Sequence, residues 1–227
     1  DARLKFQVVK GEMSYNYDLP GDGTPIIVPI NMGDGPYTFR VMQNTSGNNY
    51  VELFSVIDNV NLSSETAPFL VPNMFVNYNE SSAVVAKARE LAQGAANQGD
   101  VVRNIYQWVV DNITYDHDKA AQLASATGYV PDPDATLASG TGICFDYASL
   151  GAAMLRSLGI PCQVITGYVS PDDVYHAWNM VYIDGEWISV EISIKPNSWT
   201  RVDLTFAASG AASTIGDGTS YTDRYTY

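Results

Sequence analysis

The sequence predicts an α+β protein in which a small all-β domain precedes a mixed domain with an antiparallel sheet. Three observations indicate this. Short strand-like runs fill the first 58 residues, helical periodicity appears only after residue 80, and strand-like alternation returns at Cys162. With 227 residues, 46% of them hydrophobic, the chain is long enough for one large or two small cores. We therefore expect a β-rich domain over 1–60, a linker over 61–80 and a second domain over 81–227.

The first domain is predicted to be a small antiparallel sandwich or half-barrel. Clusters of Gly, Pro, Asp and Asn separate its short apolar runs at even spacing, which is typical of such folds. Pro29 lies inside one run and predicts an edge or bulged strand there. The four expected strands are Leu4–Val9, Ile26–Ile30, Tyr37–Met42 and Tyr50–Phe54.

Two amphipathic helices are predicted after the linker. Ser81 or Ser82 can cap a segment with Val84, Ala88 and Leu91 on one face, and Asp100 can cap a segment with Val101, Ile105, Trp108 and Val109 on one face. The chain then continues as a short extended piece near Ile113. Residues 117–141 are predicted to be a polar loop with a turn at 131–134, and loops of this length are usually functional.

The most informative stretch is Gly140–Ala148, at the start of the best helix in the chain. Apolar residues recur at Tyr147, Leu150, Met154 and Leu158, and Gly159 followed by Pro161 stops the helix. Cys144 therefore lies in the first turn. Unpaired N–H groups there favour a thiolate over a thiol and can also hold an oxyanion. The alternative is an inert buried cysteine, since free Cys is among the most buried residue types, and this stretch alone favours neither interpretation.

The two cysteines, Cys144 and Cys162, are expected to be free. A helix from Cys144 to Leu158 is about 20 Å long, and Cys162 follows its far end. Disulfide formation requires Cα atoms within about 7 Å of each other. Cys162 is predicted to be a buried residue of a strand over Cys162–Val169.

A predicted hairpin places a histidine and a carboxylate on one face of a sheet. Asp184-Gly185 separates two strand-like runs and is a strong signal for a two-residue turn. In that register Ile183 pairs with Glu186, and Tyr182 with Trp187. The same register makes His176 and Glu191 diagonal neighbours, close enough for their side chains to meet. A one-residue β-bulge between them would place the two side chains on opposite faces of the sheet.

A carboxylate beside a histidine can accept the Nδ1 proton and leave Nε2 facing a nucleophile. Each residue also has a plainer interpretation: Glu191 as a surface residue of a strand, and His176 as a hydrogen-bonded core histidine. The other histidine in the chain, His117, lies in a polar segment and is expected to be exposed.

Composition excludes some partners. Acidic residues outnumber basic ones 25 to 12, and the net charge of −13 argues against binding nucleic acid or an anionic membrane surface. No apolar run reaches the roughly 20 residues of a membrane span. The chain starts at Asp1 without a signal peptide, and its richness in Tyr, Asn, Ser, Thr and Gly favours a secreted or cell-surface protein whose signal or anchor segment is absent.

Three motifs in order resemble the transglutaminase-like superfamily of cysteine enzymes. The cysteine motif comprises Gly142–Ala148, Leu158–Pro161 and Thr166–Tyr168, and the histidine and acid motifs are His176–Asn179 and Gly185–Glu191. The resemblance covers roughly residues 81–206 and fits the bacterial members. It implies a papain-like core whose nucleophile lies at a helix N-terminus.

The resemblance also implies a Cys–His–acid triad of Cys144, His176 and Glu191, and no cofactor or metal. Aspartate is the usual acid of the family, and Glu191 is one methylene longer. Tyr115 is a candidate second oxyanion donor, or else a strand aromatic packed in the core. The predicted protein is a cysteine acyl-transfer enzyme that works through a thioester intermediate, and hydrolysis of peptide or related amide bonds is the favoured reaction. Its expected partners are peptide, protein or cell-wall amides. The alternatives are a protein-crosslinking transglutaminase and a cell-surface binding module with an inactive triad.

Overall fold

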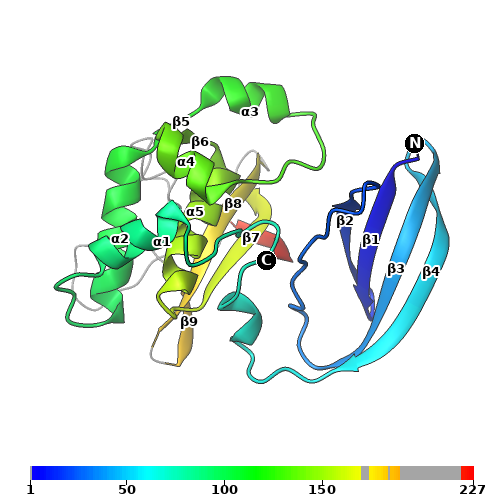
Figure 1. Ribbon diagram of the computed structural model, residues 1–227, viewed down its shortest axis with the longest axis horizontal. Helices are drawn as coiled ribbons and strands as arrows, with labels where there is room; N and C mark the ends of the chain where they lie inside the picture. Colours follow the sequence, from blue (N-terminus) through cyan, green and yellow to red (C-terminus); the bar gives the residue numbers. More distant parts are fainter. Residues whose placement is uncertain (1, 170–173, 184, 190–220) are drawn as a thin grey trace. The chain divides into compact units, whose positions relative to one another are not determined.

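The computed structural model describes residues 2–169, 174–183, 185–189 and 221–227 (Figure 1). The chain divides into two compact units, Asp1–Pro68 and Phe69–Tyr227. Within the described ranges, no helix combines the length and the apolar character that crossing a bilayer requires. Each unit is described by itself below.

The first unit is a single antiparallel sheet with the strand order β2-β1-β3-β4. Two hairpins supply the four strands, and β1 pairs with β3 in the middle. The described strands thus form one sheet, whereas the sequence indicated a sandwich or half-barrel. The strands are β1 (Leu4–Lys10), β2 (Met13–Leu19), β3 (Gly35–Ser46) and β4 (Asn49–Val60).

One expected strand of this unit is wrong and another was missed. Ile26–Ile30 is irregular, because Pro25 and Pro29 flank the apolar residues and neither can donate a ladder hydrogen bond. Strand β2 was missed because its inward positions are tyrosines among polar residues. Tyr15 and Tyr17 are both buried, with their rings stacked at 6.4 Å between centroids.

The second unit combines helices with an antiparallel sheet of strand order β10-β7-β8-β9, which confirms the predicted α+β class. A separate parallel pair joins β5 to β6. The helices are α1 (Ala83–Leu91), α2 (Gln98–Asn112), α3 (His117–Leu123), α4 (Pro133–Ser139) and α5 (Cys144–Ser157). The strands are β5 (Thr114–Tyr115), β6 (Thr141–Gly142), β7 (Cys162–Val169), β8 (Val174–Ile183), β9 (Glu186–Ser189) and β10 (Tyr221–Thr226).

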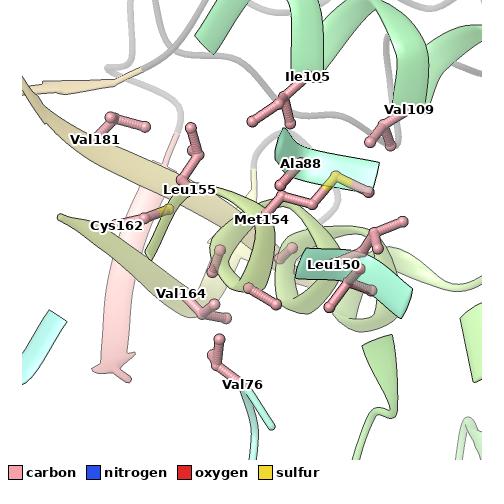
Figure 2. Close-up of a cluster of buried hydrophobic side chains, with 14 of the residues drawn as sticks. Val76, Ala88, Ile105, Val109, Leu150, Met154, Leu155, Cys162, Val164 and Val181 are labelled. Atoms are coloured by element: carbon pink, nitrogen blue, oxygen red, sulfur yellow. The ribbon is translucent and has the colours of Figure 1, made fainter. Parts of the chain in front are cut away.

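Helix α5 forms the centre of this unit. Every residue from Asp146 to Arg156 is buried, so the helix is enclosed on all sides. Figure 2 shows Met154 of α5 near Ala88 of α1 and Val109 of α2, and Leu155 on the side of Cys162 and Val181, which lie on β7 and β8. A helix enclosed in this way is held mainly by apolar burial, at about 25 cal/mol per Å² of apolar surface. Its first turn, which carries Cys144, is therefore rigidly placed.

The segment before α1 belongs to this core and is not a free connection. Val76 is fully buried, and Ser149 Oγ donates a hydrogen bond to the backbone oxygen of Phe75. The buried guanidinium of Arg156 donates to three backbone oxygens, those of Val71, Cys162 and Tyr227. Burial lowers the pKa of Arg156 to about 10, which leaves it charged at neutral pH. The second unit thus begins at Phe69, before the boundary at residue 81 that the sequence indicated.

Helix caps explain where the expected and observed helices differ. Ser82 is the N-cap of α1 as expected, but the N-cap of α2 is Asn97, whose side chain accepts from the N–H of Asp100. The expected polar loop over 117–141 contains α3 and α4. Helix α4 has Asp132 as its N-cap and Pro133 in its first turn, which is a favourable helix start. The same Asp-Pro residues are also typical of a turn, which is why the sequence indicated a turn there.

Candidate active site

Cys144 is the first residue of α5 and is partly exposed. Two glycines bring the chain to it. Gly140 ends α4 in the left-handed conformation, with a φ of 66°. Gly142 packs directly against the first turn, because a Cβ there would lie 2.7 Å from the Cβ of Asp146. The predicted position of Cys144 in the first turn of a helix is confirmed.

The parallel pair of β5 and β6 places Tyr115 beside this turn. Tyr115 pairs with Gly142, and the N–H of Asp116 donates to the Gly142 oxygen at 2.9 Å. The Tyr115 ring packs edge-on against His117, with 4.9 Å between centroids, and also packs against the apolar core. His117 is exposed, as predicted.

His176 lies on β8, opposite Gly167 of the central strand β7. It is only 6% exposed. The absence of a side chain at Gly167 is required, because a Cβ there would lie 2.1 Å from the backbone oxygen of Thr222 on β10. Strand β7 therefore packs tightly against β10, and β8 with His176 pairs along its other edge.

Cys144 and His176 line the same pocket, which has a volume of about 330 Å³. The pocket lies between the first turn of α5, the β7–β8 strands and the α3 segment. Aromatic side chains and alanines make up most of its wall. The other described residues that line it are Tyr115, Ala120, Leu123, Ala124, Ala126, Tyr129, Ile143, Phe145, Thr166, Tyr175, Ala177 and Tyr227.

The predicted hairpin register is confirmed as far as the structure describes it. Ile183 pairs with Glu186, Tyr182 with Trp187, and Met180 with Ser189. Glu191 lies outside the described residues, so its diagonal relation to His176 stays a prediction. The amide of Asn179, also on β8, donates to the backbone oxygens of Ala148 and Gln163, and this side chain therefore ties β8 to α5.

The two cysteines differ sharply in environment. Both are free thiols, as predicted. Cys162 is fully buried in the core on β7, where burial raises the pKa of its thiol to about 12. Cys144, in contrast, is partly exposed and borders the pocket. Only the second environment suits a reacting thiol.

Sequence reasoning missed a charged cluster directly behind Cys144. Asp146 is fully buried, and its carboxylate accepts from the N–H of Ile143, which caps α5. The same carboxylate accepts from Lys119 Nζ and from the hydroxyl of Tyr129. An acidic residue at the third position of a helix is a known capping signal and could have identified Asp146. The two distant donors had no such local signal.

Comparison with known proteins identifies the family. A profile described as the transglutaminase-like superfamily matches residues 85–203, just over half of the chain. The chain belongs to this superfamily. The resemblance seen in the sequence motifs is thereby confirmed, and the superfamily includes cysteine peptidases and transglutaminases.

Three curated relatives illustrate the breadth of the superfamily. Cytokinesis protein 3 of Schizosaccharomyces pombe is 33% identical over 120 residues, which are 47% of this chain and 12% of that protein. Mouse kyphoscoliosis peptidase is 31% identical over 112 residues, or 45% and 16% of the two chains. A UPF0252 protein of Methanocaldococcus jannaschii is 25% identical over 182 residues, or 77% and 49%. The chain thus spans less than half the length of each of these relatives.

A solved structure supports the fold. The crystal structure of a candidate cysteine protease from Cytophaga hutchinsonii aligns with all of this chain and 82% of its own, with a TM-score of 0.54 and 16% identity. At this identity the likeness establishes the fold alone. The papain-like α+β class that the resemblance implied is thereby confirmed.

Proposed function

We propose that this protein is a cysteine acyl-transfer enzyme that hydrolyses peptide or related amide bonds through a triad of Cys144, His176 and Glu191. The observation that carries the proposal is that Cys144, at the start of α5, and the buried His176 line one pocket. Membership of a superfamily that includes cysteine peptidases supports it. The catalytic domain in this proposal is the unit Phe69–Tyr227.

The proposed reaction has two halves. The Cys144 thiolate attacks the carbonyl carbon of the amide and forms a tetrahedral oxyanion. His176, as imidazolium, gives its proton to the leaving nitrogen, so that the C–N bond breaks and an acyl thioester remains. Neutral His176 then takes a proton from water, whose oxygen attacks the thioester. The carboxylic acid leaves, and the thiolate and imidazolium are restored.

The oxyanion needs donors that are already in place. The backbone N–H of Cys144 lies in the first turn of α5, where helix N–H groups lack helical partners. We assign the hydroxyl of Tyr115 as a second donor, because its strand pairs with Gly142 and its side chain lines the pocket. Glu191 would accept from the ring N–H of His176 and hold the imidazole in the productive tautomer.

The pocket indicates the substrate class. Apart from His176, its described lining carries no ionisable group other than tyrosine hydroxyls and Cys144 itself. Aromatic rings and alanines favour an uncharged, apolar acyl side chain next to the scissile amide. We propose peptide or protein amides of this kind as substrates, encountered by an exported enzyme at or near a cell surface.

Product analysis tests this proposal. The full chain is incubated with a library of peptide amides that vary in the acyl side chain, with and without a lysine-containing amine acceptor. We expect free carboxylic acids as the main product, fastest for apolar acyl groups. If the only product is an amide to the added lysine, the protein is a crosslinking enzyme instead. If wild type and Cys144→Ala give the same background with every amide, the protein is a binding module and the proposed activity is wrong.

A further inference from the structure

A buried carboxylate connects the helix that carries Cys144 to one wall of the pocket. Asp146 is 0% exposed and lies two residues after Cys144. Its carboxylate accepts from Lys119 Nζ at 2.7 Å and from the Tyr129 hydroxyl at 2.5 Å, and it also accepts from the N–H of Ile143 at 2.8 Å. The Lys119 ammonium lies 4.9 Å from the centroid of the Tyr129 ring. One carboxylate thus contacts both ends of the segment 119–129.

This segment supplies a large part of the pocket wall. Helix α3 and the residues after it contribute Ala120, Leu123, Ala124, Ala126 and Tyr129 to the lining. Helix α3 has no buried residue, and most residues of the segment are exposed. Apolar burial therefore stabilises this wall little. Charge-assisted hydrogen bonds are about twice as strong as neutral ones, so the contacts to Asp146 must supply much of what holds it.

Both donors keep their protons at neutral pH. Burial, together with the hydrogen bond to Asp146, raises the pKa of Tyr129 to about 12. Burial acts to lower the pKa of Lys119, but its hydrogen bonds to Asp146 and Tyr129 outweigh burial and raise it. A Lys119 ammonium and a neutral Tyr129 hydroxyl therefore both donate to the buried side chain of Asp146.

We propose that Asp146 is a positioning residue that, through Lys119 and Tyr129, holds residues 117–129 as a wall of the Cys144 pocket and thereby sets which acyl groups fit beside the nucleophile. The first part, that Asp146 holds residues 117–129 in place, is structural and does not depend on the proposed function. The second part, that this wall selects acyl groups, rests on the proposed function.

Hydrogen exchange tests the structural half without any activity. Lys119→Met removes one contact to Asp146, and Asp146→Asn removes the charge while its amide oxygen can still cap Ile143. We expect amide exchange within 117–129 to rise about ten-fold or more in Lys119→Met and Asp146→Asn, with exchange in α1 and α2 unchanged. Lys119→Arg keeps the ion pair and should restore near wild-type exchange.

Lys87→Met is the matched control. Lys87 is 25% exposed, pairs with Glu90 at 2.7 Å and lies over the ring of Trp108, whereas Lys119 is 31% exposed and pairs at the same distance. The control removes an ion pair of the same length and a similar ring contact far from Asp146 in the sequence, and its carboxylate, Glu90, is 62% exposed whereas Asp146 is buried. It should leave exchange in 117–129 unchanged. Wild-type exchange of this segment in both Lys119→Met and Asp146→Asn would overturn the proposal.

A pair of alkylating agents tests the effect on acyl groups. Iodoacetamide and N-benzyl iodoacetamide share one reactive group and differ by an apolar ring. The ratio of their rates at Cys144 cancels the thiolate fraction, which the charge changes alter. We expect the rate with N-benzyl iodoacetamide, divided by the rate with iodoacetamide, to fall about ten-fold in Lys119→Met and Asp146→Asn. In Lys119→Arg this ratio should stay near its wild-type value. An unchanged ratio with faster exchange would overturn the role in selecting acyl groups and leave a purely structural clamp.

The two proposals fail in different ways. If wild-type Cys144 does not react with either agent, the proposed function is wrong, and the exchange experiment still decides whether Asp146 holds the wall. If Cys144 reacts but neither the exchange nor the ratio changes in the variants, the function stands and the positioning role is wrong.

Discussion

Cys144→Ala is expected to lower kcat on any cleaved amide by at least about 10⁴-fold, because removing the nucleophile of a triad enzyme costs about 10⁶ in kcat. The variant should fold normally, since Cys144 lies at a helix start and is only partly buried where it packs against the core. The measurement is the initial rate of product release at saturating substrate, beside the unfolding temperature of each protein.

Cys162→Ala is the control for this prediction. Cys162 is fully buried on β7, so its truncation should lower the free energy of unfolding by about 1–2 kcal/mol. At a temperature well below unfolding it should keep wild-type activity. If Cys162→Ala loses activity while still folded, or if Cys144→Ala keeps more than a few per cent of the wild-type rate, the assignment of the nucleophile is wrong.

Glu191→Gln is expected to have the second largest effect. The substitution keeps the size of the side chain but removes the charge that steadies an imidazolium and can favour the wrong tautomer. The analogous change in a Ser–His–Asp enzyme costs about 10⁴ in kcat. Because a Cys–His pair rests partly as an ion pair, we expect a smaller loss here, on the order of 10² to 10³ in kcat/KM.

Glu191→Asp is the informative companion, because aspartate is the usual residue of the family at this position. It should keep measurable activity, whereas Gln should keep far less. Both variants should unfold near the wild-type temperature, since the expected effect is on catalysis. Wild-type rates for Glu191→Gln with any Cys144-dependent substrate would remove Glu191 from the mechanism and leave a Cys144–His176 dyad.

The parts of the fold that the sequence predicted well are those with strong local signals. Helix α5 has regular apolar spacing and a glycine stop, and it runs from Cys144 to Ser157, with the expected last residue Leu158 as its C-cap. The turn at Asp184-Gly185 determined the register of the β8–β9 hairpin. These local signals position Cys144 and the strand that carries His176, so this part of the candidate site is predictable from the sequence alone.

The parts that were missed depend on contacts between distant residues. Strand β2 has tyrosines where an apolar core residue is usual, and only its pairing with β1 reveals it. The contact of Phe75 with Ser149 spans 74 residues, and that of Lys119 with Asp146 spans 27. No periodicity or cap within either segment announces such partners. The start of the second unit at Phe69 and the wall around the pocket therefore required the three-dimensional structure.

The most direct test of the central claim is the detection of an acyl group on Cys144. The full chain is mixed with a p-nitrophenyl ester of an apolar acid, quenched in acid within seconds, and analysed by intact mass and peptide mapping. We expect one acyl group on Cys144 that neutral hydroxylamine removes, as it removes a thioester. The group should be absent in Cys144→Ala and should form far more slowly in His176→Ala.

Acylation of Cys162 in place of Cys144, or hydroxylamine-stable acylation of lysines with Cys144 unmodified, would contradict the account. Equal rates of Cys144 acylation in wild type and His176→Ala would contradict the role of the histidine. Rapid, hydroxylamine-sensitive acylation of Cys144 that depends on His176 is the result that the proposed mechanism predicts.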